Sequence, residues 1–179
     1  MSKLIETLNR LFDGRFIEVS PTTIDEPAEG MSRTLFKGKD ILDEDVLVCR
    51  LDQGSGIDMF PYLRGNSVPK GLKGMKRICD YVIFVDKGNM LFVLLIELKK
   101  GNDSPKEQLN LTVPLIEFIF ERAQMLNHLN DLKYKIRKIG ITDKDDKRPT
   151  SDRGDINYDE NDFVKLFKNK KLYLQRMLH

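Results

Sequence analysis

The sequence predicts one α/β domain, built around a small mixed central sheet that is flanked by helices. Its 179 residues are 40% hydrophobic and 32% charged, which is typical of a globular domain with a substantial core. The strongest strand patterns, residues 81–85 and 91–98, are rich in β-branched and aromatic side chains. Because Asp86-Lys87-Gly88-Asn89 lies between them, they predict a hairpin. Helical patterns precede and follow this hairpin.

The first half of the chain predicts one helix, a long loop and one short strand. Ser2 is suited to cap a helix over residues 3–12, where apolar side chains recur at helical spacing. Residues 20–45 are rich in proline, glycine and charge, which predicts mostly loop. Residues 46–51 predict a strand, and the glycine-rich stretch 53–74 predicts irregular, exposed chain.

The hairpin strands are apolar at nearly every position, so we expect both of their faces to be covered. Ser104-Pro105-Lys106-Glu107 follows them and has the form of a capping box with proline at the first helical position. The spacing predicts a helix from there to about Asn130. Pro114 should kink this helix, because proline has no N–H and crowds the preceding turn.

The last third of the chain predicts a strand over residues 134–142, then a polar linker or mobile loop over about 143–162, and then a basic tail over 163–179. We expect all 179 residues to form a single domain. Basic residues without any acid occupy both 59–79 and the tail. Each basic run fits either a nucleic-acid contact or an ordinary solvated face.

Cysteine and histidine usage argues against several classes of site. Cys49 and Cys79 each lie in an apolar run, which is typical of buried thiols rather than of a disulfide framework. His128 and His179 lack the spacing of zinc ligands. No signal-peptide pattern is present, and the longest nearly uncharged apolar run, 90–96, is much shorter than the ~20 residues that span a bilayer. We therefore expect a cytoplasmic protein without a membrane partner.

Two acids and a lysine are predicted to meet at the open end of the hairpin. With the turn at Gly88-Asn89, Asp80 lies directly opposite Glu97, at a Cβ separation of ~5 Å. Lys99 follows Glu97 by two positions and so emerges on the same face. A shift of one residue in the register would change these partners.

This arrangement suits a divalent cation. Two close carboxylates repel each other unless a positive charge lies between them. Mg²⁺, with Mn²⁺ as a substitute, prefers oxygen ligands, and the backbone carbonyl of Leu98 is a further candidate ligand. Such a metal polarises a phosphoryl oxygen and activates a water. Lys99 would orient that water or offset charge on the phosphate.

These residues resemble the core of the PD-(D/E)XK nuclease superfamily, which has a restriction-endonuclease-like fold. The resemblance lies in CDYVIF, a short turn, LLIELKKG and a helix with Gln108 near its start, and it covers about residues 76–129. It implies Asp80 and Glu97 as metal ligands, with Lys99 and Gln108 as further catalytic residues. Many members also carry a glutamate on the first helix, for which Glu6 is the candidate. Cys79 departs from the pattern, because the family usually has proline there.

The resemblance implies a metal-dependent endo- or exonuclease that hydrolyses phosphodiester bonds, with DNA as the expected substrate and RNA as the open alternative. A single small domain has little surface for reading sequence, so we expect weakly sequence-specific or structure-specific cleavage, by a homodimer or within a larger complex. Five basic residues near the acids are candidates for phosphate contact: Lys73, Lys76, Arg77, Lys100 and Lys106.

Two other interpretations stay open on the sequence. A catalytically inactive nuclease-like module would bind nucleic acid or a protein partner. The chain could also be an unrelated α/β protein. In that case the acids at positions 80 and 97 would form an exposed ion-pair cluster with neighbouring basic residues, which contributes little stability.

Overall fold

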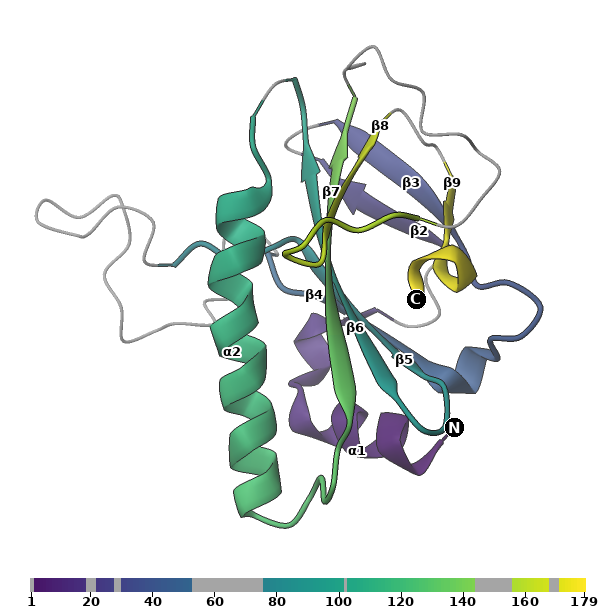
Figure 1. Cartoon of the computed structure of the whole chain (residues 1–179), viewed down its shortest axis with the longest axis vertical. Coiled ribbons are helices and arrows are strands. Elements are labelled where there is room, and N and C mark those ends of the chain that lie inside the picture. Colours follow the sequence, from purple (N-terminus) through teal and green to yellow (C-terminus); the bar gives the residue numbers. More distant parts are fainter. Residues whose placement is uncertain are drawn as a thin grey trace, which may run out of the picture.

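A computed structural model gives the fold of the chain (Figure 1). It describes seven segments: residues 2–18, 22–27, 30–52, 76–101, 103–143, 156–167 and 171–179. The stretch 53–74, which was predicted to be irregular, lies outside the described residues, as does most of the predicted linker.

The main sheet is mixed and has six strands in the order β1-β4-β5-β6-β7-β8. Within this sheet β1, β4, β5 and β6 pair antiparallel, whereas β6, β7 and β8 pair parallel. The predicted α/β class with a mixed sheet is therefore confirmed. The strands are β1 (Ile17–Glu18), β4 (Val46–Arg50), β5 (Tyr81–Asp86), β6 (Leu91–Lys99), β7 (Tyr134–Thr142) and β8 (Phe163–Phe167).

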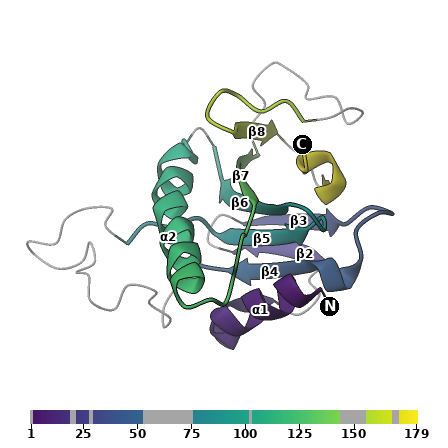
Figure 2. The ribbon, with the colours of Figure 1, turned by 60° about the horizontal axis from the view of Figure 1, so that its bottom comes forward.

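Two helices, α1 (Lys3–Leu11) and α2 (Lys106–Met125), cover the same face of this sheet (Figure 2). α1 packs against β4 and β5, and α2 packs against β6 and β7. The Ser2 hydroxyl caps α1 as predicted, accepting the N–H of Ile5 at 3.1 Å. α2 continues through Pro114 but ends at Met125, earlier than predicted, in a turn where Asn127 has a positive φ.

A second sheet covers the opposite face, so the main sheet is not flanked by helices on both sides. It consists of β2 (Thr23–Glu26), β3 (Met31–Phe36) and β9 (Lys171–Tyr173). The prediction of loop over residues 20–45 is wrong at β2 and β3, because the buried Met31, Arg33 and Leu35 alternate with polar residues in a true strand pattern. The short 3₁₀ turns are Gly14–Phe16, Asp43–Asp45 and Leu174–Met177.

The predicted hairpin and its register are confirmed. Tyr81 pairs with Ile96 and Asp86 pairs with Leu91. Val82 and Phe84 face the helices, while Ile83 faces the second sheet. Two layers therefore cover the hairpin, which explains why its strands are apolar at nearly every position.

The segment after β7 enters both sheets. Its residues 144–155 lie outside the described part of the chain, but β8 then joins the edge of the main sheet and β9 joins the second sheet beside β3. Leu172, Leu174 and Met177 are buried between the layers. No helix within the described segments is long and apolar enough to cross a bilayer.

Candidate metal-binding site

Asp80 and Glu97 meet at the open end of the β5–β6 hairpin. Asp80 directly precedes β5, so the register that pairs Tyr81 with Ile96 places it opposite Glu97. The backbone N–H of Asp80 donates to Glu97 Oε2 at 3.1 Å. The N–H of Leu98 in turn donates to Asp80 Oδ2 at 2.6 Å. One oxygen of each carboxylate is thus fixed by the backbone of the opposite strand.

Lys99 lies beside this pair, as its position two residues after Glu97 predicts. Its ammonium nitrogen is 2.8 Å from Glu97 Oε1, and the Glu97 side chain is fully buried. This contact pairs the ammonium with the buried carboxylate and opposes the effect of burial on the pKa of Glu97. A carboxylate oxygen has two lone pairs, so this oxygen can contact the ammonium and still bind a cation.

The two acids are held in an environment that disfavours their charged forms. Burial is the main reason why the pKa of Asp80 is raised, and the nearby charge of Glu97 adds to it. Burial also raises the pKa of Glu97, although the Lys99 ammonium opposes this shift. One lysine does not neutralise two buried carboxylates, so a further cation would stabilise them.

The Leu98 carbonyl is the candidate for a third oxygen ligand. In an extended strand, the N–H and C=O of one residue point toward the same neighbouring strand. Because the Leu98 N–H donates to Asp80, the Leu98 carbonyl also faces the Asp80 side of β6. Within the described segments, no three side chains of His, Cys, Asp or Glu are grouped so as to hold a metal. Two carboxylates and a carbonyl instead match Mg²⁺, which usually keeps several waters.

The N-terminal half of α2 positions the segment that leads into Asp80. The Thr112 hydroxyl accepts the buried N–H of Cys79 at 2.8 Å and donates to the Gln108 carbonyl. The Gln108 side-chain amide donates to the Ile78 carbonyl at 3.2 Å. Gln108, a predicted catalytic residue, thus contacts the backbone two residues before Asp80.

Likeness to known proteins does not assign a function to this site. No protein-family model, no curated protein and no solved structure matches this chain. The chemistry of the site is therefore inferred from its own residues.

Two further acids lie near the site and were missed in the sequence. The charge of Glu26, at the end of β2, raises the pKa of Asp80, and that of Asp52 raises the pKa of Glu97. Glu26 also lies 4.0 Å from an Arg50 nitrogen. The backbone N–H of Asp52 donates to the Asp80 carbonyl at 3.4 Å. Glu26 was missed because its segment had been predicted to be loop.

Glu6 is not brought to this site. It is exposed on α1, whose buried Ile5 and Leu8 pack on the main sheet. It is also absent from the charges that act on Asp80 and Glu97. The helical spacing explains this position, because Glu6 lies off the apolar stripe that faces the sheet.

The predicted phosphate-contacting residues are spread around the site. Arg77 forms an ion pair with Glu107 at 2.5 Å. Glu107 is the glutamate of the predicted capping box, and its side chain is used in this ion pair. The one contact of the box among the described residues is from the Lys106 N–H to the Ser104 hydroxyl, at 3.4 Å. Lys106 lies over the Phe163 ring and 3.5 Å from Asp159. Lys76 and Lys100 flank the hairpin, and Lys73 lies outside the described residues.

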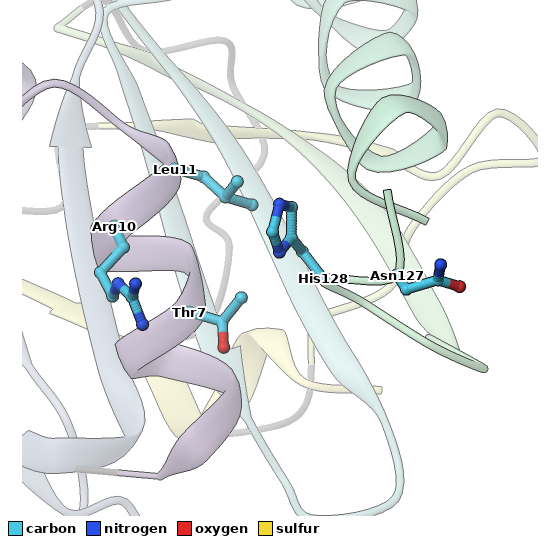
Figure 3. A pocket seen from close by; sticks show the side chains of 5 residues that line it. All are labelled: Thr7, Arg10, Leu11, Asn127 and His128. Carbon is cyan, nitrogen blue, oxygen red and sulfur yellow. The ribbon is translucent and has the colours of Figure 1, made fainter. Parts of the chain in front are cut away.

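A pocket of about 280 Å³ lies elsewhere, between α1 and the turn after α2 (Figure 3). In the figure, His128 points toward Leu11 and Thr7 of α1. The lining residues are Thr7, Arg10, Leu11, Asn127 and His128, and none of them is an acid. This pocket is therefore not the site of the predicted metal chemistry.

Proposed function

We propose that this protein is a metal-dependent nuclease of the PD-(D/E)XK type that hydrolyses phosphodiester bonds in DNA. One observation carries the proposal. Each of two buried carboxylates accepts a hydrogen bond from the backbone of the other's strand, and an ammonium group lies 2.8 Å from one of them. Burying two acids side by side is unfavourable for folding alone, which favours a functional reason for keeping them.

The donor set fits Mg²⁺. Asp80, Glu97 and the Leu98 carbonyl supply oxygen ligands only, and the Glu97 side chain is fully buried. Mg²⁺ is usually bound by one or two carboxylates together with water and substrate phosphate, so the few protein ligands fit it. When bound, the cation would polarise a phosphoryl oxygen and lower the pKa of a coordinated water.

The protein's own groups would then have distinct roles. The N–H groups of Asp80 and Leu98 hold the carboxylates in fixed positions, so little reorganisation is needed when substrate binds. Lys99, whose side chain is 19% exposed, would place its ammonium against the phosphate or the attacking water. Gln108 and Thr112 act indirectly, by holding the backbone before Asp80.

The test is a cleavage screen with single-stranded, duplex and branched DNA, and with RNA, in Mg²⁺ or Mn²⁺. We expect metal-dependent cleavage that Glu97→Ala and Lys99→Ala each reduce by ~10²-fold or more. Glu121→Ala and Lys133→Ala, which change exposed residues away from the site, are matched controls and should keep full activity.

Salt-sensitive DNA binding without cleavage in any metal would instead support an inactive nuclease-like module. Inertness toward both DNA and RNA would refute the nuclease proposal. Cleavage of RNA but not DNA would keep the chemistry and change the substrate.

A further inference from the structure

Gly140 lies directly beside the candidate site, on the central one of the three parallel strands. The register of β6 and β7 pairs it with Glu97. Leu95 of β6 and Ile136 of β7 contact the core under the helices, so the alternation along each strand places Glu97 and Gly140 on that same face. The neighbour of Glu97 on β7 therefore has no side chain.

The space that a side chain at Gly140 would take is filled by Pro105, which directly precedes α2. A Cβ at Gly140 would lie 2.2 Å from Pro105 Cγ, 3.0 Å from Pro105 Cβ and 3.3 Å from Phe163 Cε2. Gly140 does not have a positive φ, so its backbone suits other residues and the close approach of Pro105 is the reason for glycine. Pro105 is buried, and its ring is closed onto the backbone, so it cannot rotate away from an added methyl group.

The same end of α2 also holds the segment that leads into Asp80. Gln108 and Thr112 bond to the backbone of the two residues before Asp80, at 3.2 and 2.8 Å. Pro105 is joined to these turns, because its carbonyl accepts a backbone N–H of the helix at 3.3 Å. One end of α2 therefore contacts both the strand beside Glu97 and the segment before Asp80.

We propose that Gly140 is a positioning residue for the acid pair: it lets Pro105 pack directly on β7, and α2 then fixes Asp80 relative to Glu97. A methyl group at position 140 would push Pro105 from 2.2 Å to the ~3.5 Å of van der Waals contact, a movement of more than ~1 Å. Metal ligands tolerate only ~0.2 Å. That the positioned acids bind metal rests on the proposed nuclease function. That Gly140 positions them does not.

Amide hydrogen exchange in the metal-free protein tests the positioning by itself. The N–H groups of Asp80 and Leu98 make the two bonds between the acids and the opposite strands. Gly140→Ala should raise the exchange rates of both several-fold relative to that of Ile83, in the middle of β5. The double variant Gly140→Ala/Pro105→Ala should restore them, because it removes the Cγ contact at 2.2 Å and leaves the Cβ contact at 3.0 Å.

Pro105→Gly removes the same packing without adding any atom. Glycine is accepted at the position before a helix, so this variant should fold. It should raise the exchange rates of the two N–H groups less than Gly140→Ala does. It also tests the proposal if Gly140→Ala does not fold.

Gly38→Ala is the matched control for a loss of stability away from the acids. A Cβ at Gly38 would lie 2.6 Å from Gln175 Oε1, and Gly38 has a φ of +94°, so this variant should unfold at a lower temperature. Gln175 bonds to Asp40, and the Asp40 carbonyl accepts a bond from Lys87 in the hairpin turn, at the far end of the hairpin from the acids. Gly38→Ala should therefore leave the exchange of the two N–H groups unchanged relative to the middle of β5.

Mn²⁺ binding and DNA cleavage test what the positioning does for the site. With free Mn²⁺ followed by electron paramagnetic resonance, Gly140→Ala should weaken Mn²⁺ binding by ~10-fold or more. The same variant should slow DNA cleavage by ~10²-fold. The double variant should regain most of both, and Gly38→Ala should keep both.

Unchanged exchange at Asp80 and Leu98 in both Gly140→Ala and Pro105→Gly would overturn the proposal. So would faster exchange that Gly38→Ala shares, or that the double variant does not restore. If exchange behaves as expected but the wild type neither binds Mn²⁺ nor cleaves nucleic acid, the positioning stands and the nuclease proposal fails. If Gly140→Ala binds Mn²⁺ and cleaves DNA as the wild type does, the nuclease proposal stands and the positioning fails.

Discussion

Asp80 and Glu97 are joined through the backbone of opposite strands: the Asp80 N–H donates to the Glu97 carboxylate, while the Asp80 carboxylate accepts the N–H that follows Glu97. The two acids are therefore fixed relative to each other before any ligand binds. Such fixed, closely spaced carboxylates repel, and this repulsion gives the site measurable properties besides catalysis.

Removing one charge from this pair should stabilise the protein while abolishing its response to metal. Asp80→Asn keeps an oxygen to accept the Leu98 N–H but removes the repulsion with Glu97. Without metal at mildly alkaline pH, we expect an unfolding temperature higher by about 2–4 °C for each kcal/mol of relief. Differential scanning fluorimetry with and without Mg²⁺ measures both effects. A metal response equal to that of the wild type would contradict the assignment of Asp80 as a ligand.

The stability of the metal-free protein should fall as pH rises through the neutral range. The pKa values of Asp80 and Glu97 are raised mainly by burial, so the folded protein keeps these protons at a pH where the unfolded chain, with carboxyl pKa values near ~4, has lost them. Their stabilising contribution is complete below the unfolded pKa values near ~4. It is lost as the pH rises from there to the raised pKa values of the folded protein. Each group changes the free energy of unfolding by at most ~1.4 kcal/mol per pH unit.

Urea unfolding across a pH series checks this dependence. Mg²⁺ binds the ionised carboxylates, so the metal-induced increase in stability should grow with pH. Asp80→Asn should flatten both trends, and an equally steep fall in this variant would assign the dependence to other groups.

Thr112 should contribute to stability and to activity together. Thr112→Val keeps the shape of the side chain but leaves the buried Cys79 N–H without its acceptor. We expect a loss of about 1–3 kcal/mol in the free energy of unfolding, and slower cleavage because Asp80 directly follows this bond. Thr112→Ser supplies the same hydroxyl and should restore most of both. Urea titration and initial cleavage rates are the measurements.

Arg77 and Glu107 provide a paired test of phosphate contact. Their side chains are 34% and 62% exposed, so breaking their ion pair should change the free energy of unfolding by less than ~1 kcal/mol. If Arg77 binds a DNA phosphate, Arg77→Ala should weaken binding and reduce the salt slope by ~1, whereas Glu107→Ala, which releases Arg77, should strengthen binding. Equal affinities for both variants would remove Arg77 from the interface.

The hairpin and its acids were predictable because local patterns determine them. Gly88 has a positive φ of 79° in the turn, and the apolar runs on either side leave one register that aligns the strands. The predicted proximity of Asp80, Glu97 and Lys99 is confirmed as geometry. Their roles in metal binding and catalysis stay predictions.

Other parts of the site depend on partners that are distant in the sequence. β3 gains its buried face only by packing on the main sheet and by pairing parallel with β9 near the C-terminus. Charged residues such as Glu26 and Arg33 break the apolar pattern of β2 and β3, so their segment was predicted to be loop. Which charges gather around Asp80 is set by this packing and cannot be read from local spacing.

The short separation of Asp80 and Glu97, 17 positions along the chain, has a consequence for how the site assembles. Closing one antiparallel hairpin brings both acids and Lys99 together, and such low-contact-order steps are fast. The parallel pairing of β6 with β7 instead requires the whole α2 crossover. Spacing within the site is thus encoded locally, whereas its shielding from water depends on late, long-range docking. Substitutions that disrupt the packing of α2 or β7 should therefore expose these charged side chains to solvent more readily than they separate them.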